Sequence, residues 1–322
     1  MRHFLALLDA FFLTRPLLLA PVWGFSVFGL FRGLSAGGRA PMNMLWTVRH
    51  NGATFGWMAI FSLSVASVYV LNQIADVNVD KFNKGLPLLA KGKLSLAAAW
   101  WTAILCLALS ILLPFFSHPS ISAFSCGAAL LGIAYSFRPL RFSGRPCFDF
   151  LTNAAGYGLI AFGVGWHLSG AAFSVAGFAA SALPYFLLMC AGSISSTFPD
   201  YEGDKKCGKI TTAVALGVRR AHAVAMVSLC SSLAVSVALG DAIALMCAAG
   251  ALPFYIFYCI RPGVRAMEAT YKGGGLLCMA AAAVLMPVVA IVTGVLAIST
   301  RLYFNLRHHV SYPTLVPIHH EK

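Results

Sequence analysis

The chain has 322 residues, of which 59% are hydrophobic and only 10% are charged, and its mean hydropathy is +0.81. A typical soluble domain carries about 25% charged residues, so this composition excludes an ordinary soluble protein and indicates one that lies in a bilayer. The formal net charge is +13, but the basic residues gather in alternate loops, which excludes a nucleic-acid partner as the reason for that charge.

Long stretches with few or no charges predict membrane-spanning helices of about 20 residues. An apolar segment from Phe4 to Leu13 precedes them and is expected to form an interfacial helix. No flexible linker divides the chain, so we expect one all-α integral membrane domain over residues 1–300, followed by a polar, flexible tail over residues 301–322. Nine spans are expected, at residues 17–33, 54–74, 95–115, 120–137, 151–168, 172–198, 221–239, 242–260 and 274–298.

The distribution of lysine and arginine predicts the orientation of this nine-helix bundle. Four fall between spans two and three, three between four and five, five between six and seven, and three between eight and nine, whereas the loops 116–119, 169–171 and 240–241 contain none. The rich loops and the N-terminus are therefore expected in the cytoplasm, and the odd number of spans leaves the C-terminal tail outside. The expected location is the cell inner membrane, with the active-site loops cytoplasmic.

Two acidic clusters follow the second and sixth expected spans, at the same cytoplasmic edge. The first contains Asn72, Asp76 and Asp80 within LNQIADVNVDKFNK, and the second contains Asp200 and Asp204 within FPDYEGDKKCGK. The aspartates in each cluster are four residues apart, so they project from one face of a helix. Each pair is offset from the other by 124 residues, which indicates two related halves that each supply two carboxylates to one shared cavity.

Carboxylates near lipid are costly and are usually retained for a function. Oxygen ligands favour Mg²⁺, which proteins commonly hold with one or two carboxylates together with substrate phosphates. Lysines and arginines beside both clusters favour direct phosphate contacts. In a protein surrounded by lipid, these features predict a diphosphate with a long apolar tail, such as an allylic polyprenyl diphosphate. Loss of pyrophosphate from it would leave an allylic cation in a dry, aromatic-lined cavity, where a nucleophilic acceptor captures it.

The segment N72-Q-I-A-D76-V-N-V-D80 resembles the NxxxDxxxD motif of the UbiA superfamily of intramembrane prenyltransferases, and the segment from Asp200 to Gly217 resembles that family's second motif. The Tyr135–Arg141 segment, Y-S-F-R-P-L-R, and the Arg15-Pro16 pair are also similar to family motifs. The resemblance implies a Mg²⁺-dependent prenyltransferase in which four aspartates are catalytic metal ligands and cationic and aromatic side chains bind phosphate. It assigns Asn72, Asp76 and Asp80 to one Mg²⁺, Asp200 and Asp204 to a second, and Tyr135, Arg141 and Lys209 to the diphosphate.

This sequence departs from the family pattern where Leu86 stands in place of an arginine, so that phosphate contact is either missing or supplied by Lys84 or Lys91. Glu202 lies off the Asp200/Asp204 face of an ideal helix and is left out of the metal set. Asp149 and Asn153 form another four-spaced pair, for which a helix N-cap is favoured over a polar cavity wall. Gly156, Gly158, Gly163 and Gly165 are expected to allow close helix packing.

Other classes of function remain open from the sequence. A transporter with acidic cation sites is the main alternative, although the acidic residues lie at the cytoplasmic edge among lysines rather than at mid-span. A lipid-binding protein without catalysis is a third class, which the intact aspartates argue against. Within the prenyltransferase hypothesis the default acceptor is aromatic, as in quinone-type lipid biosynthesis, while the acceptor's identity, the prenyl chain length and the oligomeric state stay undetermined.

Overall fold

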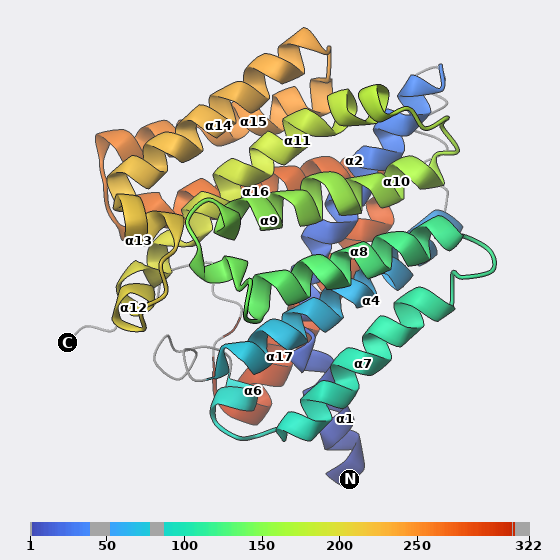
Figure 1. Ribbon diagram of the computed structural model, residues 1–322, viewed down its shortest axis with the longest axis vertical. Coiled ribbons are helices and arrows are strands. Elements are labelled where there is room, and N and C mark those ends of the chain that lie inside the picture. The colour runs from blue at the N-terminus through green and yellow to red at the C-terminus, as the bar shows by residue number, and fades with distance from the viewer. Residues whose placement is uncertain (1, 39–51, 78–86, 311, 313–322) are drawn as a thin grey trace.

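A computed structural model describes residues 2–38, 52–77, 87–310 and 312 of the chain (Figure 1). The regular elements in these residues are all helices. The long ones are α2 (Ala20–Ala36), α4 (Gly52–Ala75), α7 (Leu96–Leu112), α8 (Pro119–Ser136), α11 (Val175–Ser196), α14 (Val218–Ala238), α15 (Ala242–Ile260), α16 (Val264–Leu285) and α17 (Pro287–His308). One further long rod consists of α9 (Phe148–Ala155), the π-helical segment η3 (Gly156–Ala161) and α10 (Phe162–Leu168).

The ends of these helices follow from local sequence. The side chains of Ser95, Ser174 and Asp241 each accept a hydrogen bond from the backbone N–H three residues later, which satisfies an otherwise unpaired donor at the start of α7, α11 and α15. Pro119 and Pro287 occupy the first turns of α8 and α17, where the missing proline N–H has no cost.

Seven of the described helical segments are long and apolar enough to cross a membrane. They are residues 5–36, 52–75, 119–136, 175–206, 218–238, 242–260 and 287–308, while α7 is a shorter apolar helix. The expected ninth span over residues 274–298 is wrong, because Met286 has an extended backbone and Pro287 begins a new helix. Residues 301–308, which were assigned to a flexible tail, belong to α17.

The end of α17 returns to the N-terminal segment α1 (Arg2–Leu13). Two nitrogens of the Arg307 guanidinium donate to the buried Asp9 carboxylate of α1, each at 2.6 Å. One turn further along α1, the Leu13 carbonyl accepts a hydrogen bond from Gln73 near the end of α4 (2.8 Å). The prediction that the chain's C-terminal part lies on the opposite side from its N-terminus is therefore wrong, since α16 and α17 together return to the side of α1.

The long helices run alongside one another between two ends of the bundle (Figure 1). One end carries α12 (Tyr201–Lys206), α13 (Thr212–Leu216) and the last turn of α4, and we call it the acidic end because both acidic clusters reach it. The α7–α8 and α10–α11 turns lie at the opposite end. Successive helices thus bring residues that are far apart in sequence to one end of the bundle.

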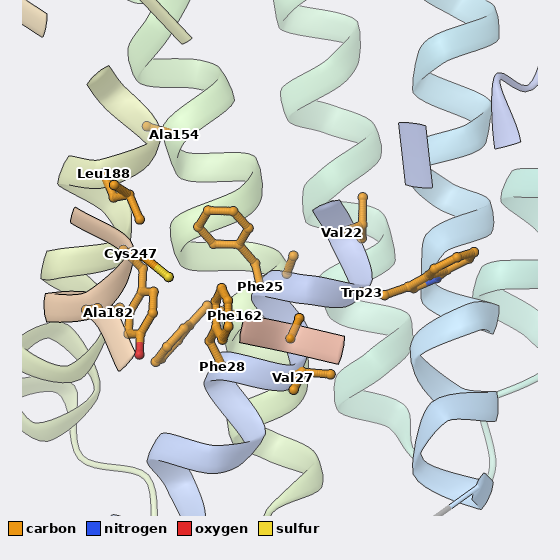
Figure 2. Close-up of a cluster of buried hydrophobic side chains, with 14 of the residues drawn as sticks. Val22, Trp23, Phe25, Val27, Phe28, Ala154, Phe162, Ala182, Leu188 and Cys247 are labelled. Carbon is orange, nitrogen blue, oxygen red and sulfur yellow. The ribbon is translucent and has the colours of Figure 1, made fainter. Parts of the chain in front are cut away.

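The core is aromatic around the middle of α2. Figure 2 shows Phe25 and Phe28 of α2 next to Phe162 of α10, and the ring of Phe28 stacks on Tyr185 of α11 with centroids 5.2 Å apart. These four rings are buried and belong to one hydrophobic cluster. The rings hold α2, α10 and α11 in fixed positions around the cavities described below.

Glycines let α2 and α10 approach with backbones in contact. A Cβ atom on Gly165 would lie 1.7 Å from the Ser26 carbonyl oxygen, and one on Gly29 would lie 1.9 Å from the Phe162 carbonyl oxygen. The predicted packing role of Gly165 is confirmed, and Gly158 and Gly163 are similarly enclosed. Gly156 is an exception: the nearest atom to its Cβ position is a Leu131 methyl at 4.0 Å.

Candidate active site

A polar cavity of about 310 Å³ opens at the acidic end, where α4, α8, α9 and α11 terminate or begin. Six of the nine predicted site residues line it: Asn72, Asp76, Tyr135, Asp200, Asp204 and Lys209. A seventh, Arg141, reaches one of these side chains. Asp80 and Lys84 lie outside the described residues. The remaining wall residues are Arg15, Ser143, Asp149, Asn153, Ser196, Thr197 and Thr211.

The first cluster extends the end of α4. The Asp76 backbone N–H donates to the Asn72 carbonyl at 2.9 Å, which continues the helical pattern and stacks the two side chains on one face. The Asn72 amide lies 3.3 Å from one oxygen of Asp76, and the Arg141 guanidinium lies 3.2 Å from the other. Asp76 is buried, so the Arg141 charge compensates for a carboxylate that would otherwise be costly in this position.

The second cluster occupies η4 (Phe198–Asp200) and α12. Asp204 is buried and Asp200 is exposed, and both line the polar cavity. Glu202 is exposed and does not line it. A tight turn through Gly208, with φ of +69°, brings the Lys209 N–H onto the Asp204 carbonyl (2.9 Å). The same turn brings the Lys209 ammonium 3.7 Å from the Asp204 carboxylate.

Burial lowers the pKa of Lys209, but Asp204 foremost, followed by Tyr135, Asp76 and Asp200, opposes that effect, so the pKa lies above the usual 10.5. Lys209 is therefore a fixed positive charge at neutral pH. Together with Arg141 it gives the acidic cavity two cations that can bind an anion.

Asp149 does not cap its own helix, in contrast to the favoured prediction. The N-cap position of α9 is Cys147, and the Asp149 carboxylate instead accepts hydrogen bonds from the backbone N–H (2.7 Å) and the hydroxyl of Thr212 at the start of α13. Burial raises the pKa of Asp149, and the Thr212 hydrogen bonds partly counteract this. Both Asp149 and Asn153 line the polar cavity, so the α9 face ties the loop after Lys209 to the bundle.

Arg15 is a cavity residue that the sequence marked only through the Arg15-Pro16 pair and that was not placed in the predicted site. Its backbone has φ of +52° immediately before Pro16, which directs the chain from α1 into η1 (Pro16–Leu19). Its Nε atom is buried and has no hydrogen-bond partner among the described residues. A guanidinium with an unused, buried donor on the wall of this cavity favours an anionic ligand.

Two less polar chambers adjoin the polar cavity. The small chamber, of about 200 Å³, lies between α4, α8 and α9–η3 and is lined by Arg15, Val22, Val65, Val68, Tyr69, Asn72, Ala128, Leu131, Gly132, Tyr135, Thr152, Asn153, Gly156 and Tyr157. The large chamber, of about 550 Å³, lies mainly between α2, α11, α15 and α16, and its wall includes Phe25, Leu188, Gly192, Ala251 and Met279. Arg15 lines all three spaces, and Tyr157 lines both chambers.

The donor set fits a hard divalent cation. Within the described residues, no three His, Cys, Asp or Glu side chains form a ready metal cage. Mg²⁺ does not require one, because it keeps several waters and shares substrate phosphates. One buried oxygen of Asp204 has no hydrogen-bond partner in the part of the chain that is described, since Lys209 at 3.7 Å is too distant for a hydrogen bond. That free oxygen, with Asp76, Asp200 and Asn72 on the same wall, matches the preference of Mg²⁺ for oxygen ligands.

An all-helical membrane bundle with paired acidic segments at one end defines a recognisable class. The UbiA prenyltransferase family profile matches residues 34–268, so the chain belongs to this family and is an integral membrane protein. Among solved structures, a UbiA homolog from Archaeoglobus fulgidus bound to DMAPP and Mg²⁺ has a similar fold, with a TM-score of 0.62 at 20% identity, covering 86% of this chain and 99% of that one.

Two plant proteins are among the similar sequences. A probable homogentisate phytyltransferase 2 from Oryza sativa subsp. japonica is 36% identical over 159 residues, which is 46% of this chain and 41% of that protein. A homogentisate solanesyltransferase from Arabidopsis thaliana is 35% identical over 158 residues, covering 46% and 40%. The chain thus spans less than half the length of these curated relatives.

Proposed function

We propose that the protein is a Mg²⁺-dependent intramembrane prenyltransferase that moves a polyprenyl group from an allylic diphosphate to an acceptor. The observation that carries the proposal is the junction of three spaces: a polar cavity with carboxylates and cations, and two less polar chambers that share wall residues with it. A diphosphate with an apolar tail and a second substrate require this combination. Family membership and the names of the two plant relatives support the same reaction class.

The diphosphate would occupy the polar cavity. Asn72, Asp76, Asp200 and Asp204 would hold Mg²⁺ there, with Asp80 completing the first motif as a prediction. The bound metal would neutralise the negative charge of the diphosphate and favour its departure. Lys209 and Arg141 would contact the phosphates directly.

Arg15 lines all three spaces, and its buried Nε has no hydrogen-bond partner among the described residues, so it would contact the diphosphate at their junction. Tyr135 lies on the wall shared by the polar cavity and the small chamber, and it would bind an oxygen of the leaving group. Such contacts hold the allylic C–O bond at the mouth of both chambers. The reacting carbon is thereby placed where an acceptor can approach it.

Cleavage of the C–O bond leaves both electrons on pyrophosphate and a positive charge on the allylic carbon. Phe25 and Tyr157, whose ring centroids are 5.7 Å apart, give the junction aromatic faces that stabilise such a charge. The largely apolar chamber walls exclude water, which would otherwise capture the cation. The acceptor supplies an electron pair, forms the new bond and loses a proton.

The acceptor proposed here is an aromatic ring of the quinone-precursor type, and the named substrates of the two plant relatives favour this choice. The active-site end is proposed to face the cytoplasm at the cell inner membrane, on the basis of its lysine- and arginine-rich loops. A transporter with acidic cation sites is disfavoured, because the carboxylates share their cavity with Lys209 and Arg15 and lie at one end of the bundle.

The test is Mg²⁺-dependent release of pyrophosphate by purified protein in detergent, given geranylgeranyl diphosphate and a panel of homogentisate, 4-hydroxybenzoate and a prenylated glycerol phosphate. We expect release to require Mg²⁺ and an acceptor, and to fall at least a hundredfold in Asp76→Asn and Asp204→Asn. Glu202→Gln is the matched control, since Glu202 is exposed and off the cavity wall. No release with any acceptor, together with no Mg²⁺-dependent binding of the donor, would refute the proposal.

A further inference from the structure

A pair of tyrosines marks the boundary between the two chambers. The hydroxyls of Tyr69 on α4 and Tyr157 on η3 are 2.5 Å apart, and the Tyr69 hydroxyl also lies 3.1 Å from the Leu18 carbonyl. A carbonyl can only accept, so Tyr69 donates to Leu18 and Tyr157 donates to Tyr69. The oxygen of Tyr157 therefore has used its proton and retains lone pairs that can accept a hydrogen bond from another molecule.

The backbone around this pair is specialised. Tyr157 belongs to the six-residue π-helical segment η3, which interrupts the rod between α9 and α10. Such interruptions are rare and are frequently found at functional sites. Gly156, directly before Tyr157, faces the small chamber, and the nearest described atom to its Cβ position is 4.0 Å away, unlike at the packing glycines that follow it. The local structure thus opens a space beside Tyr157 instead of filling it.

The two chambers differ in size and chemistry. A cavity of about 150 Å³ is enough to bind benzene, so the small chamber of about 200 Å³ matches one substituted ring. Its walls combine aliphatic side chains with the polar groups of Tyr69, Tyr157, Thr152 and Asn153. The large chamber has more than twice that volume, about 550 Å³, and it is lined mainly by apolar groups, which suits a chain of several isoprene units.

We propose that the small chamber is the acceptor site, that it takes a hydroxylated aromatic ring, and that a ring hydroxyl donates a hydrogen bond to the Tyr157 oxygen. The large chamber takes the prenyl chain. This assignment rests on the proposed prenyl transfer and adds which space holds which substrate. Tyr157 and Arg15 both line the two chambers, so they lie where the chambers meet. An acceptor ring bound to Tyr157 would therefore lie next to the allylic carbon of the donor, whose diphosphate is beside Arg15. Tyr69 is a positioning residue, because it fixes the Tyr157 hydroxyl through the Leu18 carbonyl.

Two glycines provide a matched pair of tests. Of the two chambers, Gly156 lines the small one and Gly192 on α11 lines the large one, and no atom of the described residues lies within 4 Å of the Gly192 Cβ position. Gly156→Leu should raise the KM for homogentisate at least tenfold while leaving Mg²⁺-dependent binding of geranylgeranyl diphosphate unchanged. Gly192→Leu should shift donor preference from geranylgeranyl to geranyl or dimethylallyl diphosphate, with the KM of the acceptor unchanged.

The hydroxyl contact is tested by Tyr157→Phe, which keeps the ring and removes the oxygen. We expect the KM for the acceptor to rise by about tenfold, the loss of one hydrogen bond, with donor binding unchanged. A ring analogue without the hydroxyl should inhibit the wild-type protein and Tyr157→Phe equally. If the Tyr157 hydroxyl had a purely structural role, Tyr157→Phe would also weaken inhibition by the analogue and binding of the donor.

The opposite pattern would overturn the assignment: Gly156→Leu changing donor chain length, or Gly192→Leu changing the acceptor KM. Turnover by the wild-type protein with the prenylated glycerol phosphate but with neither ring would also overturn it, while leaving prenyl transfer intact. Equal acceptor KM values for the wild type and Tyr157→Phe would remove Tyr157 from the site. Absence of both donor binding and pyrophosphate release would instead reject the prenyltransferase proposal and the acceptor site with it.

Discussion

Replacing Asp149 with alanine should free α13 and the loop that carries Lys209 from the bundle. The buried carboxylate accepts two hydrogen bonds from Thr212, and hydrogen bonds to a charged group contribute about 1.5–3 kcal/mol each. Burial nevertheless raises the pKa of Asp149, which means that desolvation offsets part of that gain. We therefore expect a local destabilisation of about 3 kcal/mol, near the lower limit of the sum for the two bonds.

Hydrogen exchange measured by mass spectrometry on the segment 208–217 is the assay. Local opening that is easier by about 3 kcal/mol makes exchange roughly a hundredfold faster. Asp149→Asn keeps one carbonyl acceptor and should give an intermediate rate. Asn153→Ala is the control on the same helix, because Asn153 donates to the Asp149 backbone and not to α13. Unchanged exchange of this segment in Asp149→Ala would refute the reasoning.

Two further substitutions test the fold by heating in detergent followed by size-exclusion chromatography. Gly165→Ala places a methyl group 1.7 Å from the Ser26 carbonyl oxygen and should cost at least about 3 kcal/mol or abolish the folded protein. Gly294→Ala adds a methyl group with no described atom within 4 Å and should stabilise the protein by up to about 1 kcal/mol. Equal stability of the two variants would contradict the backbone contact at Gly165. Arg307→Ala removes the cation that pairs with the buried Asp9 and should cost about 3 kcal/mol of folding stability. Adding Asp9→Asn should restore much of that loss. A wild-type melting temperature for Arg307→Ala alone would show that the ion pair between α1 and α17 is dispensable.

The sequence predicts most of the bundle because hydrophobic length is a strong constraint in a membrane. It fails at residues 274–298, where the apolar stretch is continuous although Pro287 divides it into α16 and α17. Hydropathy measures composition and does not register a proline that begins a second helix. The predicted side of the chain's C-terminal part is wrong for the same reason. That side was predicted from the number of spans, and the expected ninth span is two helices.

The polar side chains of the site can also be predicted from sequence, because a polar group near lipid costs free energy and such residues are therefore rare in apolar segments. Asn72, Asp76, Asp200 and Asp204 reach one cavity in the structure, while their roles as metal ligands stay predictions. Asp149 is misread for an instructive reason. An aspartate at the start of a helix is a good cap by local rules, and only the tertiary structure brings Thr212 from 63 residues away to bind it.

The chambers could not be predicted, because they arise where side chains are missing. Gly156 and Gly165 look alike in sequence, yet the first borders an open chamber and the second is pressed against α2. What separates them is the partner helix that faces each one, and no single-sequence pattern contains that information. Under the proposed function, the carboxylates and cations of the polar cavity would determine whether the reaction occurs, and the small residues that border the chambers would determine substrate choice. Substitutions at Gly156 and Gly192 address that choice directly, whereas substitutions at the aspartates address only whether the reaction occurs.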